Sequence, residues 1–211
     1  MASSNPSDTD HRKHHWEDVY AAKASTEVSW YQAVPATSLS LIRTSGAGRA
    51  AKIIDIGGGA STLADCLLAD GYRNITVLDI SATALDRARQ RLGPAADQIE
   101  WLVADIVSWQ PRTRYDLWHD RAVFHFLTDP QERRAYLTTL TAAIQPGGTL
   151  ILGTFALDGP ERCSGLSVCR YSPETLAEEI GTAFTLVQTV AEDHTTPSGT
   201  VQRFVYCRFT R

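Results

Sequence analysis

The sequence has no long apolar run, no excess of positive charge and no paired cysteine motif, and each absence disfavours a class of protein. No apolar segment approaches the roughly 18 residues that a membrane-spanning helix needs, and the polar amino terminus has no signal-peptide core. The net charge of −4 disfavours a nucleic-acid-binding protein, because such surfaces are normally basic. None of the 4 cysteines belongs to a C-x-x-C pair, so free thiols are expected. We therefore expect a cytoplasmic protein with neither a membrane nor a nucleic acid as partner, and these features leave its oligomeric state open.

The remaining composition is that of an ordinary globular domain, with 43% hydrophobic and 21% charged residues among 211. Residues 1–14 are polar and are predicted to form a disordered tail, whereas residues 15–211 are predicted to form a single domain. Three histidines in the leader have no cluster of partner ligands, so we expect a solvated segment there rather than a metal site.

From residue 51 onward, short apolar segments alternate with amphipathic ones. Strands are expected at residues 51–56, 75–78, 100–103, 115–118 and 149–155, with helices at 36–43, 61–69, 81–92, 130–144 and 172–181. Strands separated by helices imply a parallel sheet with right-handed crossovers. Two further strands, at residues 184–190 and 201–209, have only a turn between them and should pair antiparallel. The pattern predicts an α/β fold.

The most informative segment is I-I-D-I-G-G-G-A-S at residues 53–61, where an apolar strand runs through Asp55 into glycines and then a helix. Such a turn opens backbone N–H groups to a crevice and lets a ligand approach the main chain. A glycine turn without a ligand is the alternative. A dinucleotide fingerprint would need a glycine where Thr62 stands, and a phosphate P-loop would need the absent G-K-[ST].

Two more acids follow strands in the same way. Asp79 ends the second strand and suits the two hydroxyl groups of a ribose, whereas Asp105 ends the third and suits an adenine amino group. Ile80 and Ile106 are placed to sandwich an adenine ring. Each acid alone would also serve as a cap for the following segment. Three acids at three successive strand ends favour a nucleoside site.

These motifs resemble those of the class I S-adenosylmethionine-dependent methyltransferases. The resemblance covers roughly residues 15–211 and rests on D-I-G-G-G at 55–59, the two later acids, Y-D-L-W at 115–118 and Q-P-G-G at 145–148, although Ser61 replaces a glycine. It implies a Rossmann-like three-layer sandwich, with a seven-stranded, mostly parallel sheet and an antiparallel C-terminal strand. It also implies S-adenosyl-L-methionine as cofactor, with its ribose on Asp79 and its adenine on Asp105. The methionine part would lie on Gly57, Gly58 and Gly59, supported by Asp55.

The leader H-W-E-D-V-Y at residues 15–20, followed by Trp30, is similar to that of a subgroup that includes protein-lysine methyltransferases. This similarity implies that Tyr20 and Trp30 close over the cofactor. A hydrophobic lid that does not touch the cofactor is the alternative.

The fourth strand runs into H-D-R-A-V-F-H-F at residues 119–126, and its side chains should face the crevice. Methyl transfer mainly needs an aligned acceptor in a site that excludes water, with a base only where the acceptor must lose a proton. We predict His119 near the methionine end of the cofactor, Asp120 as the catalytic group that orients or deprotonates the acceptor, and His125 as a second candidate base. The alternatives are an Asp120–Arg121 ion pair that orders the loop, and a core role for His125.

The favoured hypothesis is therefore an enzyme that methylates an N, O or S atom of a small-molecule acceptor. A protein-lysine methyltransferase and a non-catalytic S-adenosylmethionine-binding protein are the alternatives. A nicotinamide oxidoreductase is disfavoured by Thr62, and a nucleic-acid base as acceptor is disfavoured because the N/D-P-P-Y signature is absent.

Overall fold

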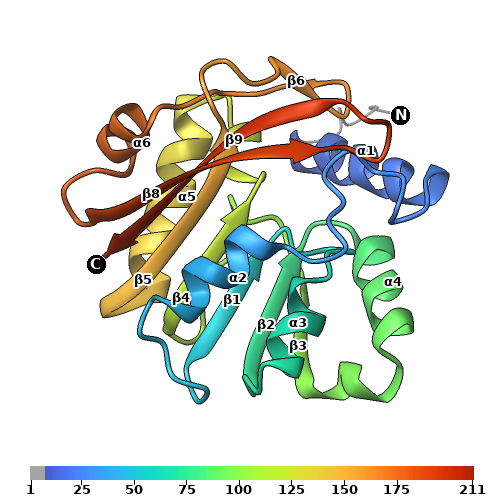
Figure 1. The fold of residues 1–211 in the computed structure, drawn as a ribbon, viewed down its shortest axis with the longest axis horizontal. Helices are drawn as coiled ribbons and strands as arrows, with labels where there is room; N and C mark the ends of the chain where they lie inside the picture. Colours follow the sequence, from blue (N-terminus) through green and yellow to red (C-terminus); the bar gives the residue numbers. More distant parts are fainter. Residues whose placement is uncertain (1–7) are drawn as a thin grey trace, which may run out of the picture.

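The central feature of the computed structural model, which describes residues 8–211, is a sheet in the strand order β3-β2-β1-β4-β5-β9-β8 (Figure 1). The five strands from β3 to β5 are parallel, and β9 runs antiparallel between β5 and β8. The predicted seven-stranded sheet with an antiparallel C-terminal strand is confirmed. The strands are β1 (Lys52–Ile56), β2 (Asn74–Asp79), β3 (Ile99–Val103), β4 (Tyr115–Arg121), β5 (Ile144–Phe155), β8 (Thr185–Thr195) and β9 (Val201–Thr210).

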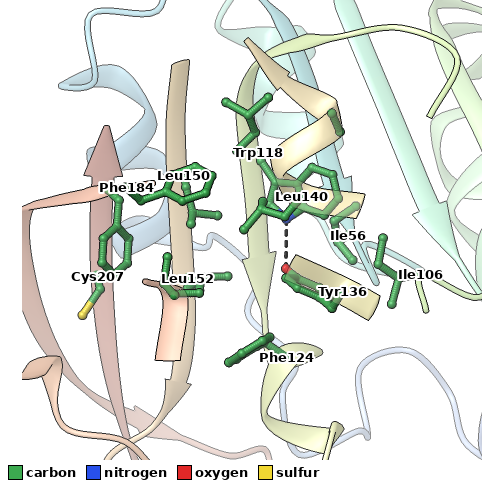
Figure 2. Packing of buried hydrophobic residues seen from close by; sticks show 14 of the residues in the cluster. Ile56, Ile106, Trp118, Phe124, Tyr136, Leu140, Leu150, Leu152, Phe184 and Cys207 are labelled. Carbon is green, nitrogen blue, oxygen red and sulfur yellow. Dashed lines mark hydrogen bonds between the residues drawn. The ribbon is translucent and has the colours of Figure 1, made fainter. Parts of the chain in front are cut away.

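Helices cover both faces of this sheet and complete three layers (Figure 1). One apolar cluster joins the sheet to α5 and α6, and Figure 2 shows part of it around Trp118 and Tyr136. A second cluster joins the other face to α2, α3 and α4. The helices are α1 (Asp8–Ala22), α2 (Ala36–Arg43), α3 (Leu63–Ala69), α4 (Ala82–Leu92), α5 (Pro130–Ala143) and α6 (Pro173–Ile180), with short 3₁₀ helices η1 (Gly93–Gln98) and η2 (Phe124–Phe126) and a hairpin of β6 (Arg162–Cys163) and β7 (Leu166–Ser167). Within residues 8–211, no helix is long and apolar enough to cross a bilayer.

Local sequence signals place the starts of α4, α5 and α6. The Ser81 side chain accepts a hydrogen bond from the backbone N–H of Ala84 and caps α4. Asp129 caps α5 in the same way, with Pro130 in the first helical turn, where no backbone N–H is needed. Ser172 and Thr175 form a capping box at α6. These caps account for the agreement between expected and observed helix starts.

The amino-terminal segment differs from expectation. Residues 8–14 were predicted to be disordered together with residues 1–7, but α1 begins at Asp8, so the prediction is wrong for 8–14. Residues 1–7 lie outside the described residues. The local sequence has no apolar periodicity to signal this helix, and its order comes from tertiary contacts. Arg12 forms ion pairs with distant acids, and the Trp16 ring packs edge-on against Trp30 and Phe126.

Candidate active site

Two adjoining pockets lie at the carboxyl ends of the parallel strands. The first pocket is at the ends of β2 and β3 and contains Asp79 and Asp105. The second is at the glycine loop after β1 and contains Asp55 and His119. The two pockets share five lining residues: Tyr20, Trp30, Ile56, Gly57 and Arg121.

The structure brings together nearly all of the residues predicted to bind the cofactor. Ten of them line one or both pockets: Tyr20, Trp30, Asp55, Gly57, Gly58, Asp79, Ile80, Asp105, Ile106 and His119. Gly59 is the exception, but a Cβ atom there would lie 2.6 Å from Asp79 Oδ2. Residues from three separate strand ends and from the leader therefore form one crevice.

The glycine loop is tight because carboxylates pack against its backbone. Gly57 has a φ of +63°, and a Cβ atom at this position would overlap the Val123 side chain. A Cβ at Gly58 would lie 2.5 Å from Asp55 Oδ2. Larger residues would displace the groups that shape the pockets, so the glycines keep the loop narrow and its backbone accessible.

Asp79 is a buried carboxyl with few donors. Its Oδ1 accepts a hydrogen bond from the Ser81 backbone N–H at 2.8 Å. Burial raises the pKa of Asp79 to about 7, and the negative charges of Asp55 and Glu17 add to this effect, while backbone hydrogen bonds oppose it. A ligand that donates hydrogen bonds here, such as a ribose diol, would therefore stabilise the ionised carboxylate.

Asp105 is tied to the amino-terminal helix. Its Oδ1 accepts from the Val107 N–H at 3.1 Å, and its Oδ2 accepts from Arg12 at 2.8 Å. Arg12 also donates to Glu132 Oε1 at 2.5 Å. The guanidinium thus connects α1 to the end of β3 and to α5, and it lines the first pocket.

Asp55 orients the His119 ring in the wall of the second pocket. The Asp55 Oδ1 atom lies 2.7 Å from His119 Nδ1, and the Ser38 hydroxyl lies 2.9 Å from His119 Nε2. The neutral tautomer with its proton on Nδ1 satisfies both contacts, because it donates to the carboxylate and accepts from the hydroxyl. All three side chains are buried, so the ring has a defined orientation at the pocket wall.

Asp120 is placed differently from the predicted catalytic group. It is fully buried and lines neither pocket. Its oxygens accept from the N–H groups of Val123, at 3.0 Å, and Phe124, and from the Tyr136 hydroxyl at 2.7 Å. Burial raises its pKa to about 6, although these hydrogen bonds oppose the rise. This geometry gives Asp120 a structural part: it holds the turn after β4, where Ala122 has a φ of 67°.

The alternative of an Asp120–Arg121 ion pair is also wrong. Successive side chains of a strand point to opposite faces of the sheet. Asp120 faces Tyr136 of α5, whereas Arg121 donates to the hydroxyl of Tyr206 on β9 and lies 3.8 Å from Glu192.

His125, the second predicted base, lies in the core beside the pockets and lines neither. Its ring packs against those of Phe126 and Phe155, and its Nδ1 accepts weakly from the Phe155 N–H at 3.4 Å. Burial and the positive charge of Arg121 lower the pKa of His125 to about 3, so the ring is neutral and weakly basic near pH 7. This environment fits the alternative of a core histidine.

Aromatic rings from the leader form one wall of the crevice. Tyr20 packs edge-on against Trp30, with ring centroids 6.1 Å apart, and Trp16 joins Trp30 to Phe126. Sequence reasoning missed four further lining residues, Arg12, Trp16, Arg121 and Phe126, as site residues. Trp16 belongs to the leader motif and could have been selected. Arg121 and Phe126 belong to the segment 119–126 that was expected to face the crevice, and they could have been selected on that ground. The position of Arg12 depends on tertiary contacts, and no sequence signal indicates it.

Comparisons with known proteins agree with this geometry. A family model described as a methyltransferase domain matches residues 53–148. Nodulation protein S of Rhizobium tropici is 30% identical over 107 residues, which are 51% of this chain and 44% of that protein. Malonyl-[acyl-carrier protein] O-methyltransferase 2 of Ilyobacter polytropus is 28% identical over 107 residues, 50% of this chain and 40% of that protein. The chain thus matches less than half the length of these two curated relatives.

The fold has counterparts among solved structures. The N-methyltransferase NodS from Bradyrhizobium japonicum, in complex with S-adenosyl-L-homocysteine, superposes with a TM-score of 0.71 at 21% identity, covering 94% of this chain and 98% of that one. The sheet order and the glycine loop define a Rossmann-like methyltransferase fold. The match to the methyltransferase-domain model covers the part of this fold that holds the glycine loop, Asp79 and Asp105.

The residues of the two pockets fit an S-adenosylmethionine cofactor. A Cβ atom at Gly57, Gly58 or Gly59 would collide with the side chain of Val123, Asp55 or Asp79, so the three glycines let these side chains pack against the loop. Next to the glycine loop, the buried Asp79 carboxyl lines the first pocket and accepts the Ser81 backbone N–H on Oδ1, so a ligand can donate to its other oxygen. The apolar side chains of Ile80 and Ile106 line the first pocket, as a flat heterocycle requires.

Proposed function

We propose that this protein transfers the methyl group of S-adenosylmethionine to a small-molecule acceptor. The observation that carries the proposal is the single crevice in which Asp55, Asp79 and Asp105 surround a glycine loop at adjacent strand ends. In this proposal, Asp79 binds the ribose, Asp105 the adenine amino group, and the loop with Asp55 and His119 the methionine part. Tyr20 and Trp30 cover the cofactor from the leader.

The residues act by binding, orientation and exclusion of water rather than by base catalysis. Bound S-adenosylmethionine would supply an activated methyl carbon to a lone pair of the acceptor, with S-adenosylhomocysteine as the leaving group. The aromatic wall of Trp16, Trp30 and Phe126 excludes water and holds the acceptor near this carbon. Since Asp120 and His125 line neither pocket, we propose that the acceptor arrives as a competent nucleophile or loses its proton to solvent.

A small molecule is favoured over a protein lysine because α1 and its tryptophan lie along the pocket. One of the two named relatives is a malonyl-[acyl-carrier protein] O-methyltransferase, whose name gives a small acyl group on a carrier protein as its acceptor rather than a lysine. A cytoplasmic location stays a prediction of the sequence.

The test is cofactor binding followed by labelled methyl transfer. Isothermal titration should show that S-adenosylhomocysteine binds and that NAD does not. Asp79→Asn should weaken the S-adenosylhomocysteine complex by roughly 10- to 100-fold, because a charge-assisted pair of hydrogen bonds to the ribose is lost. The matched control, Asp86→Asn on the exposed face of α4, should leave affinity unchanged.

Labelled methyl transfer into a cell extract should place the label in the low-molecular-mass fraction. Label confined to protein would favour the lysine alternative. Absence of S-adenosylhomocysteine binding to the wild-type protein would reject the proposed function.

A further inference from the structure

Arg121 is the last residue of β4, and its guanidinium lies where the two pockets meet. It lines both of them, and its side chain is only 10% exposed. A position at the junction of a nucleoside pocket and a methionine pocket is next to the place where the methyl group would be presented. A buried cation there bears directly on what the acceptor can be.

Most of the Arg121 side chain is held rigidly. Its Nε–H donates to the Tyr206 hydroxyl at 2.8 Å, and one terminal nitrogen donates to the Trp30 carbonyl at 3.0 Å. The guanidinium carbon lies 4.5 Å from the centre of the Phe204 ring. The planar group is therefore fixed before any ligand binds, which lowers the entropic cost of binding one.

The second terminal nitrogen has no hydrogen-bond partner anywhere in residues 8–211. The acid nearest to it is Glu192, whose Oε1 is 3.8 Å away, beyond hydrogen-bond distance, and that oxygen already accepts from Gln32 at 2.9 Å. A buried guanidinium N–H group without an acceptor is costly, which favours a ligand oxygen at this place. Arg12, the other arginine in the first pocket, is different because it is paired with two carboxylates.

We propose that this free edge of Arg121 binds an anionic oxygen of the methyl acceptor, so that the acceptor is an acid with an apolar body. The inference rests on the proposed function and narrows its substrate class. The oxyanion would receive N–H donation from Arg121, while Trp16, Trp30 and Phe126 contact the apolar part. A carboxylate and a phosphoryl group share this chemistry, and the experiment separates them.

The experiment uses the intact protein saturated with S-adenosylhomocysteine, with thermal unfolding as readout. The probes are phenylacetate and phenylphosphonate, and the neutral control is phenylacetamide. We expect at least one anion, but not the amide, to raise the unfolding temperature of the wild-type complex, because a ligand of the native state stabilises it. Whichever anion binds more tightly identifies the headgroup.

Three variants locate the effect. Arg121→Met should weaken anion binding by at least about tenfold, and Arg121→Lys should give an intermediate loss, because lysine keeps the charge without the planar fork. Arg203→Met on β9, which β5 separates from β4, removes an exposed arginine that pairs with Asp158, and this variant should bind the anion as the wild type does. The affinity for S-adenosylhomocysteine, measured by titration, should stay within about threefold in all variants, where a factor of ten is about 1.4 kcal/mol.

Three results would overturn the proposal: no anion stabilises the wild-type complex, Arg121→Met keeps anion binding, or Arg121→Met lowers the affinity for S-adenosylhomocysteine more than tenfold. The last result would assign Arg121 to the cofactor carboxylate instead. If Arg121→Met does not fold, the Arg121→Lys comparison decides. Failure of the wild type to bind S-adenosylhomocysteine at all is a separate outcome, which removes the proposed function and this inference together.

Discussion

Asp79 makes the crevice sensitive to pH. In the free protein, burial raises its pKa to about 7, so a proton is held there through mildly acidic conditions. Because ribose hydroxyls donate hydrogen bonds to the ionised form, a bound ligand must displace this proton below pH 7. The same shift means that the contribution of Asp79 to the stability of the free protein falls as pH rises from about 4, the unfolded value, to about 7.

We therefore expect the dissociation constant of S-adenosylhomocysteine to rise by roughly tenfold per pH unit below pH 7 and to be flat above it. Calorimetric titrations between pH 5.5 and 8.5, in buffers of different ionisation enthalpy, would count the protons released. The dependence should disappear in Asp79→Asn. An affinity that is constant from pH 5.5 upward would contradict the assignment of Asp79 to the ribose.

Asp120 belongs to a hydrogen-bonded chain in the core. The Trp118 indole N–H donates to the Tyr136 hydroxyl at 2.9 Å (Figure 2). That hydroxyl in turn donates to Asp120. Asp120→Asn replaces an acceptor by an amide and leaves buried N–H groups unpaired, so it should lower the free energy of unfolding by about 2 kcal/mol or more.

For a chain of this length, that loss corresponds to a fall in Tm of roughly 4–8 °C, measured by calorimetry. The folded fraction should keep its kcat within about threefold, since the carboxyl does not reach the pockets. The opposite pattern, an unchanged Tm with kcat reduced a hundredfold, would restore Asp120 as the catalytic group.

At the scale of elements, α1 is the part that closes the crevice. Its Glu17 carboxylate accepts hydrogen bonds from the Ala82 and Thr83 N–H groups and the Ser81 hydroxyl at the start of α4. Burial alone would raise the pKa of Glu17, but these hydrogen bonds outweigh it and lower the pKa. Arg12 adds the ion pairs to Asp105 and Glu132, so one helix is anchored on both sides of the first pocket.

Arg12→Ala should therefore loosen α1 without unfolding the sheet. We expect faster hydrogen exchange in residues 8–22 and dissociation of S-adenosylhomocysteine accelerated by about tenfold, with little change in Tm because partly exposed ion pairs contribute about 1 kcal/mol or less. Arg89→Ala, which removes an exposed pair within α4, is the matched control. Equal exchange and dissociation rates in both variants would show that Arg12 does not anchor the helix.

At the scale of the whole molecule, the order of the sheet was predictable because its signals are local. The run I-I-D-I in β1 is buried on both faces, as expected for a central parallel strand, and caps such as Ser81 and Asp129 start helices where the sequence indicates. β8 was expected to end at Val190 but continues to Thr195. The added residues 191–195 pair with β9 as far as Val201. Pairing with a distant strand, rather than local propensity, determines that boundary.

The amino-acid sequence alone determined the α/β fold and the cofactor crevice, because acids and glycines at strand ends are brought together by any parallel sheet in this order. Only the tertiary structure decided which polar groups face the pockets. Asp120 and Arg121 are neighbours in sequence, yet strand alternation sends one into the core and the other to the pocket junction. Likewise, α1 is ordered by contacts with residues about a hundred positions away, which no local pattern in its own polar sequence reports.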